Sequence, residues 1–191
     1  MNRRLTALCL ASLPLLATAP ALSDDNDGHR HDGYDRHTWS PIVQKVREAT
    51  ARYLDANAAV AAGYAPDPFC VSGRDEGAMG IHFVNGALIG DGALDVSTPE
   101  ILIYEPLPGG RLRLLGAEYI TFADAWHGTH TGSPALEGHL LNHTGAPNRY
   151  AIPAFYEIHV WAWKDNPAGT FADFNPRASC DAYVPPAPSA P

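Results

Sequence analysis

The sequence predicts an α+β domain in which one N-terminal helix packs on a mainly antiparallel, curved sheet or partial β-barrel. Residues 41–62 have apolar side chains at helical spacing, and the rest of the chain has short strand-like runs between turn residues. Two cysteines far apart in the sequence predict one disulfide bond. The chain has 191 residues, 46% of them hydrophobic and 18% charged, which suits a single core of modest size.

The first 23 residues have the pattern of a cleaved signal peptide. Two arginines precede an apolar run from Leu5 to Leu22, and small residues surround the expected cleavage point near Ser23. A membrane anchor is the alternative, but the run is at the lower length limit for a span and two prolines interrupt it. We therefore expect a periplasmic or extracellular protein with no membrane segment after cleavage.

Two terminal segments are expected to be disordered. Residues 24–39 form an acidic, His-rich tail, and its part from Asp24 to His37 has no aliphatic side chain to bury. The three histidines of this tail could collect copper, nickel or zinc loosely, or the tail is only a solvated linker. Residues 185–191 are rich in proline, so residues 40–184 remain as a single α+β domain.

Residues 41–62 are predicted to form the helix. Ser40 can cap it, Pro41 suits its first turn, and Gly63 ends it. The apolar residues that share one side of this helix are Ile42, Val46, Ala49, Tyr53 and Val60. One face of the helix therefore packs on the rest of the domain, and the other faces water.

Four later segments have the composition and alternation of strands. They are Met79–Asn85, Glu100–Glu105, Arg111–Phe122 and Ala154–Lys164. Residues 123–153 are rich in His, Gly, Pro, Thr and Asn with little periodicity, and loops of this length are more often functional than idle.

Cys70 and Cys180 are expected to form the disulfide. Cys9 leaves with the signal peptide, and an oxidising compartment favours pairing of the two cysteines that remain. Two separate buried thiols are the alternative.

Alternation along the strands places three polar side chains on otherwise apolar faces, and each comes from a different strand. These residues are His82, Glu118 and His159. A lone buried carboxylate such as Glu118 is costly, so it must be neutralised, paired or bound to a metal. Two imidazoles and a carboxylate form a ligand set for zinc, iron, manganese or copper with open coordination positions. The sequence therefore predicts a divalent metal site.

Four further residues are assigned to this site. His127 and His130, from the long loop, could complete or cap the ligand set. Glu105 and Glu157 are expected to orient the histidine ligands through hydrogen bonds.

An aromatic face on the last predicted strand suggests a pocket for a small-molecule ligand. Phe155, Trp161 and Trp163 alternate there with two titratable groups, a combination typical of ligand pockets. Alternatively, the two tryptophans cover the sheet against a loop.

A metal-free binding or interaction module is the alternative function. In that case Glu118 would pair with an arginine such as Arg74 or Arg149. The sequence leaves both functions open, and it decides neither whether the site is catalytic nor the oligomeric state.

Several function classes are excluded. The formal net charge is −8 and no segment concentrates Lys and Arg, so nucleic acid is not expected as a partner. The motifs HExxH, GxSxG, GxxxxGK, GxGxxG and CxxC are all missing from the sequence.

The blocks GYAPDPFCVSGRDEGAMGIHFVN, PEILIYEP, RLLGAEYI and AFYEIHVWAWKDNPAGTFADFNP occur in this order. With them, the chain resembles a widespread group of exported bacterial proteins of uncharacterised activity. The resemblance covers Gly63 to Cys180. It implies a single exported domain and implies no activity.

Overall fold

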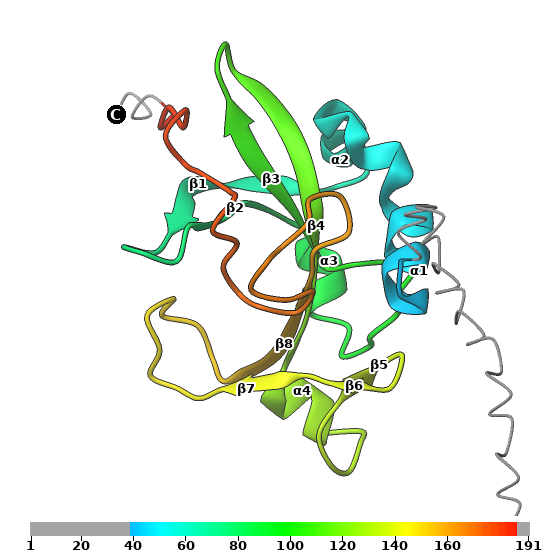
Figure 1. The fold of residues 1–191 in the computed structure, drawn as a ribbon. Helices are drawn as coiled ribbons and strands as arrows, with labels where there is room; N and C mark the ends of the chain where they lie inside the picture. The colour runs from blue at the N-terminus through cyan, green and yellow to red at the C-terminus, as the bar shows by residue number, and fades with distance from the viewer. Residues whose placement is uncertain (1–38, 187–191) are drawn as a thin grey trace, which may run out of the picture. The chain divides into compact units, whose positions relative to one another are not determined.

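The structure is a computed structural model that describes residues 39–186 (Figure 1). The predicted signal peptide, the His-rich tail up to residue 38 and residues 187–191 of the Pro-rich segment lie outside the described residues. Within residues 39–186, no helix has the length and apolar character that crossing a membrane requires.

The N-terminal helical segment is divided into short pieces. Helix α1 (Pro41–Thr50) continues into a 3₁₀ turn, η1 (Ala51–Leu54), and α2 (Ala56–Ala61) follows. Between η1 and α2, Asp55 has an extended backbone, and its carboxylate accepts a hydrogen bond from the Asn57 amide. The prediction of one unbroken helix is therefore wrong at this point, because Asp55 acts as the N-cap of a second helix.

The main sheet has six strands, and every neighbouring pair is antiparallel. In spatial order the strands are β1 (Ala65–Ser72), β2 (Ala78–Val84), β3 (Ile101–Leu107), β4 (Arg111–Phe122), β8 (Phe155–Val160) and β7 (Asn142–Thr144). The sheet is open, with β1 and β7 at its edges. The predicted α+β class with a mainly antiparallel sheet and one disulfide is thus confirmed.

Strand β4 has the predicted bounds, but β8 ends four residues earlier than predicted, at Val160. Strand β1 was not predicted at all, because Pro66 and Pro68 indicate a break in regular structure. An edge strand tolerates prolines, since one side of its backbone needs no partner.

Short elements occupy the connections. They are α3 (Gly86–Ile89), α4 (Ala123–His127) and a small second sheet of β5 (Ala135–Leu136) and β6 (His139–Leu140). The segment predicted as a long loop therefore contains one helical turn and three short strands, including β7.

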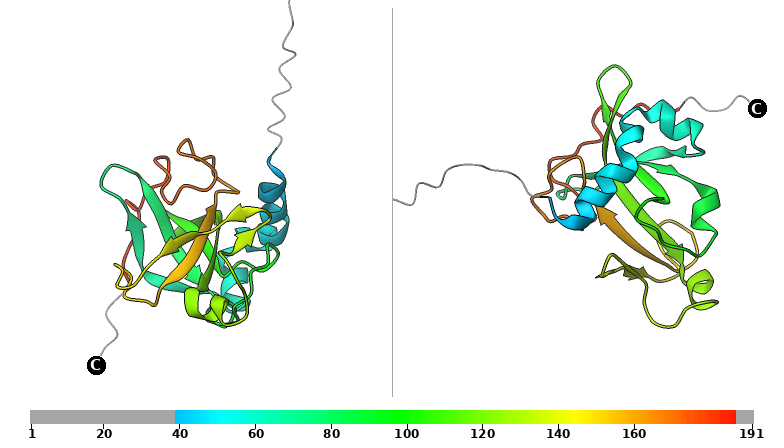
Figure 2. Two further views of the ribbon diagram at one scale, coloured as in Figure 1. Left: turned by 90° about the horizontal axis from the view of Figure 1, so that it is seen from below. Right: turned by 90° about the vertical axis from the view of Figure 1, so that its right-hand side faces the viewer.

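The two faces of the main sheet are covered differently. Ile42 and Val46 of α1 pack with Ala117 and Tyr119 of β4 in one large cluster of buried side chains. The views in Figures 1 and 2 show α1 and α2 along this side of the sheet. On the other face, Trp161 packs with residues of the C-terminal segment such as Ala178. The alternate side chains of each strand therefore enter different surroundings.

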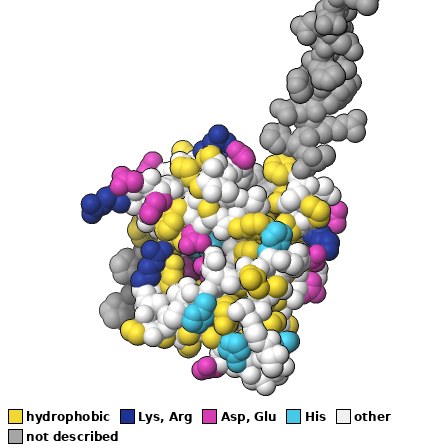
Figure 3. Space-filling model, turned by 60° about the horizontal axis from the view of Figure 1, so that its bottom comes forward, with side chains coloured by type: hydrophobic (Ala, Val, Ile, Leu, Met, Phe, Trp, Pro, Cys, Tyr) yellow, Lys and Arg dark blue, Asp and Glu magenta, His cyan; other side chains and the backbone are white. Residues whose placement is uncertain are grey.

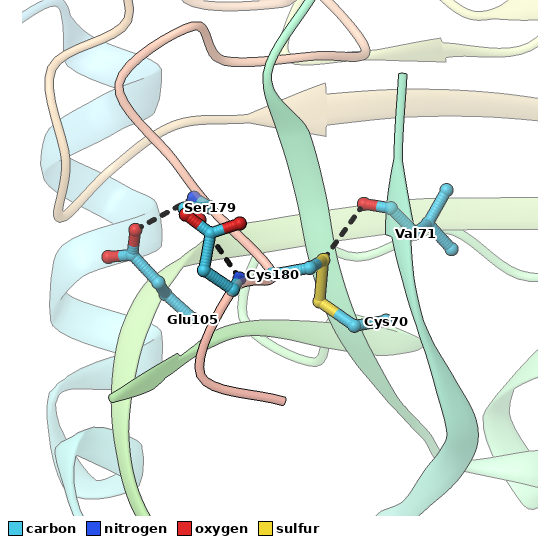
Figure 4. The surroundings of a disulfide bond; sticks show 6 residues. Cys70, Val71, Glu105, Ser179 and Cys180 are labelled. Atoms are coloured by element: carbon cyan, nitrogen blue, oxygen red, sulfur yellow. Dashed lines mark hydrogen bonds between the residues drawn. A yellow bond between two sulfur atoms is a disulfide. The ribbon is translucent and has the colours of Figure 1, made fainter. Parts of the chain in front are cut away.

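The predicted disulfide between Cys70 and Cys180 is present, and Figure 4 shows its surroundings. The two Cα atoms are 5.8 Å apart although 110 positions separate the residues in the sequence. Next to it, the Ser179 amide donates a hydrogen bond to Glu105. The disulfide bond thus fixes the C-terminal segment to the edge strand β1.

Candidate metal centre

A cavity of about 730 Å³ lies on the face of the sheet opposite α1 and α2. Its walls come from β1, β2, α3, β3, β4, β8 and the loop that contains Arg149 and Tyr150. Acidic and histidine side chains are visible in a recess of the surface in Figure 3. Pockets of this size hold small-molecule ligands in many proteins.

Strand register brings the three predicted ligands to one end of this cavity. Glu118 of β4 lies directly opposite His159 of β8. His82 of β2 is paired with Ile103 of β3, and Ile103 is paired with Gly116 of β4. Gly116 and Glu118 are two residues apart on β4, so they share a face of this strand. The three side chains therefore point to the same side of the sheet from three strands.

The distances between these side chains suit a single ion. The Nε2 atom of His82 lies 3.3 Å from Oε2 of Glu118, and Nε2 of His159 lies 3.7 Å from the same oxygen. One ligand atom from each residue lies within 4.8 Å of the other two. Tetrahedral coordination with bonds near 2.1 Å puts ligand atoms roughly 3.4 Å apart. Little rearrangement would be needed to enclose an ion.

All three side chains are buried, and their charges are coupled. Burial raises the pKa of Glu118, but the nearby imidazoles of His159 and His82 outweigh this effect and hold the pKa below its usual value. Burial lowers the pKa of His159, but Glu118 above all, then Glu157 and Asp173, outweigh burial and raise it to about 9. Both shifts favour the charged forms of an imidazolium–carboxylate pair when no ion is bound.

The second nitrogen of His159 faces two further carboxylates. Its Nδ1 atom lies 3.0 Å from Oε2 of Glu157 and 3.8 Å from Oδ1 of Asp173. Glu157 is the neighbour of His159 on the same face of β8, as alternation predicts. Asp173 lies in irregular chain after β8, where no periodicity indicates which way a side chain points.

Hydrogen bonding at this end of the cavity is incomplete. Neither ring nitrogen of His159 has a hydrogen-bond partner, and Oε2 of Glu157, although close to Nδ1, is not aligned with it as an acceptor. Buried polar atoms without partners are rare in folded proteins. These atoms are therefore available to an ion or a ligand in the cavity.

Asp67 of β1 is a further cavity residue that the sequence did not single out. Burial raises its pKa, while the charge of His82 lowers it. The strand that carries it was missed because of its prolines, so no alternation pattern drew attention to this carboxylate.

Glu105 does not orient the histidines, contrary to the prediction. Its carboxylate forms ion pairs with Arg113 and Lys164 and accepts a hydrogen bond from Ser179. Glu105 is four residues along β3 from Ile101, the partner of Glu118, which corresponds to about 13 Å along a strand. It shares the face of the ligands but lies at the far end of the strand.

The loop histidines do not join the three ligands either. Nε2 of His127 lies 3.0 Å from the hydroxyl of Tyr156, whose side chain belongs to the α1 face of β8. The ring of His130 stacks on Trp126 at a centroid distance of 3.8 Å. His127 thus lies on the opposite side of β8 from His159, and neither histidine lines the cavity, so the predicted role as additional ligands is wrong.

Of the three predicted aromatic wall residues, Phe155 lines the cavity and the two tryptophans do not. Trp161 covers the sheet and donates to the carbonyl of Ala172. Trp163 reaches the other face and donates to the hydroxyl of Thr50 in α1. Trp161 thus stays on the face that alternation predicts, but the C-terminal segment covers it, as the alternative interpretation predicted. Trp163 departs from alternation because β8 ends at Val160.

Glu118 is not paired with an arginine. Within residues 39–186 its ion pairs are formed with His82 and His159. Arg149 lines the same cavity but donates a hydrogen bond to the hydroxyl of Tyr150, and Arg74 forms no ion pair within the described part of the chain. This finding removes the arginine pairing on which the alternative function depended.

Comparisons of the chain with family models, curated proteins and solved structures find no match.

Proposed function

We propose that this chain is an exported protein that binds one divalent metal ion through His82, Glu118 and His159. Zinc, ferrous iron, manganese and copper are the candidate ions for two imidazoles and one carboxylate. The observation that carries the proposal is the convergence of these three buried side chains, with ligand atoms within 4.8 Å of one another, at the end of a cavity.

The surroundings of the ligands support this assignment. A histidine that binds a metal through Nε2 commonly donates Nδ1–H to a carboxylate, which fixes the ring and its tautomer. Glu157 lies 3.0 Å from Nδ1 of His159 and is placed for this role after a small adjustment of its side chain. Asp173, at 3.8 Å, is the second carboxylate on that side.

Three protein ligands leave coordination positions free on the side of the cavity. An ion held in this way can bind a ligand molecule directly, and it can act as a Lewis acid toward it.

Export is supported by the signal-peptide pattern at the N-terminus and by the disulfide, which persists in oxidising compartments. Cell fractionation of a host that produces the full chain, with mass spectrometry of the product, tests this part. We expect a periplasmic or extracellular product that lacks roughly the first 23 residues. A full-length cytosolic product would contradict it.

Elemental analysis of protein purified without chelators tests the metal site. We expect close to one equivalent of a transition metal, and its loss in the His82→Gln and Glu118→Gln variants. His130→Gln is the matched control, because His130 stacks on Trp126 outside the cavity.

The His-rich tail requires a separate control, since its histidines could also bind metal. A variant with His29, His31 and His37 replaced by Gln should retain the tightly bound equivalent. Equal metal content in His82→Gln, Glu118→Gln and the parent protein, with all variants folded by circular dichroism, would refute the site. Loss of all metal in the tail variant alone would assign binding to the tail instead.

A further inference from the structure

The cavity changes from polar to apolar along its length. On the cavity face, β4 carries Glu118, then Ile120, then Phe122, and β8 carries His159, then Glu157, then Phe155. Ile120 and Phe155 belong to one apolar cluster with Ile101. Successive residues on one face of a strand are about 7 Å apart. A molecule that fills this cavity therefore has a polar group at the ion and an apolar body beyond it.

The loop that closes the cavity is held in shape by Asn148. The side-chain amide of Asn148 donates to the carbonyls of Gly145 and Ile152, and its oxygen accepts from the amide of Tyr150. Ala151 in this loop has a φ of 55°, a left-handed conformation that costs free energy for a residue other than glycine. Arg149, Tyr150 and Ile152 are thus presented to the cavity by a preformed loop.

Arg149 lines the same cavity as the three proposed ligands. Its guanidinium lies 5.7 Å from the ring centre of Phe174, which directly follows Asp173, the residue near Nδ1 of His159. It also donates a 2.9 Å hydrogen bond to the hydroxyl of Tyr150.

Although three carboxylates line the same cavity, Arg149 forms no ion pair within residues 39–186. The guanidinium is therefore available to bind the carboxylate of a ligand. Arginine binds such a group through two parallel hydrogen bonds.

We propose that the cavity binds a monocarboxylate with an apolar body, its carboxylate held between the metal ion and Arg149 and its body against Ile120 and Phe155. The inference rests on the proposed function, because the ion supplies one side of the headgroup site. A divalent ion with Glu118 as its one anionic ligand keeps one positive charge, which a single carboxylate neutralises.

The choice of headgroup is tested with three probes that share one apolar body. Octanoate, octan-1-ol and octylamine are titrated by calorimetry into zinc-loaded protein at neutral pH. A hydrogen-bonded charge contact should make octanoate bind about tenfold more tightly than octanol. Octylamine should bind most weakly. Equal affinities for all three, or tightest binding of octylamine, would overturn the proposal.

The role of Arg149 is tested with a matched pair of variants. Arg149→Gln should remove most of the preference for octanoate over octanol. Arg111→Gln is the control, since Arg111 lies at the exposed start of β4 and does not line the cavity. An unchanged preference in Arg149→Gln would refute the assignment of this residue.

Metal content measured in the same samples separates the two proposals. Bound ion without any preference for octanoate refutes the carboxylate ligand and leaves the metal site intact. A preference for octanoate in the parent protein that is equally strong after chelation refutes the placement of the carboxylate at the ion. Retention of the ion in Arg149→Gln together with loss of the preference supports both.

Discussion

The two faces of the main sheet differ in the hydrogen bonding of their buried polar groups. On the face that packs against α1 and α2, three tyrosine hydroxyls each donate to a backbone carbonyl: Tyr64 to Pro99, Tyr104 to Tyr53 and Tyr119 to Val96. On the cavity face, both ring nitrogens of His159 and one oxygen of Glu157 have no hydrogen-bond partner. The hydroxyls of Thr121 and Tyr183 are exceptions on the first face.

The satisfied hydroxyls hold the fold, whereas the unsatisfied atoms of His159 and Glu157 lie together at the end of the cavity. A tyrosine whose hydroxyl is satisfied by a backbone carbonyl stabilises the packing between sheet and helices. A buried polar atom without a partner costs about 1–3 kcal/mol. The ion that we propose at this end of the cavity would give Nε2 of His159 a partner.

The largest expected effect concerns the disulfide bond between Cys70 and Cys180. Replacing both Cys70 and Cys180 with Ser should lower the free energy of unfolding by up to about 4–5 kcal/mol, because a long loop in the unfolded chain is released. Denaturant titration of the variant and the parent protein measures this loss. Equal midpoints and slopes would show that packing alone holds β1 and the C-terminal segment.

Two neighbours on β3 that point to opposite faces compare the faces directly. Leu102 is fully buried against the helices, whereas Ile101 lines the cavity. Leu102→Ala should lower the free energy of unfolding by about 2–5 kcal/mol, since it creates a new void. Ile101→Ala should cost less because it enlarges a cavity that already exists. Equal losses in thermal unfolding would argue that both faces are packed alike.

A second buried carboxylate provides a contrast with Glu118. Glu100 is buried, and within residues 39–186 it forms no ion pair with a basic side chain. Burial raises its pKa from about 4.5 to about 8. The folded protein therefore binds a proton that the unfolded chain has lost between these two pH values.

Because of this proton, the contribution of Glu100 to stability is fully present below pH about 4.5 and declines as pH rises toward about 8. The expected slope is on the order of 1 kcal/mol per pH unit. Glu100→Gln should flatten this part of the stability profile measured by denaturant titration. A slope that is the same in the variant would mean that Glu100 is ionised in the folded protein.

The smallest expected effect concerns the orientation of His159. Glu157→Gln should weaken metal binding about 10–100-fold, because a neutral amide orients the imidazole less strongly than a carboxylate does. Competition with a chromophoric chelator measures the affinity. Glu137→Gln is the control, since Glu137 pairs with the exposed Lys45 away from the cavity. Equal affinities in both variants would remove Glu157 from the site.

Alternation along single strands was informative where the strands are regular. It put Glu118 on the face of Ile120, and it put His159 on the face of Glu157, as the structure has them. It was not informative for Trp163, which follows the end of β8, or for Asp67, which lies on a proline-containing edge strand. Period-two reasoning is valid only while the backbone stays extended.

The distance between two residues on the same face of the sheet could not be predicted either. Glu105 and Glu118 both lie on the cavity face, but the pairing of β3 with β4, including a bulge between Ile103 and Tyr104, sets how far apart they are. A sequence indicates which side of a strand is buried, but the register between strands depends on every contact across the sheet.

By itself, the sequence determined the α+β class, the two cysteines that pair and the side of its strand from which each candidate ligand points. These properties follow from local periodicity and from composition. Only the tertiary structure decided that His82, Glu118 and His159 meet, that Asp173 lies beside His159, that Arg149 lines the same cavity, and that His127 and His130 do not. These contacts join segments distant in the chain, and they depend on strand order, register and the path of irregular loops, which no local pattern encodes.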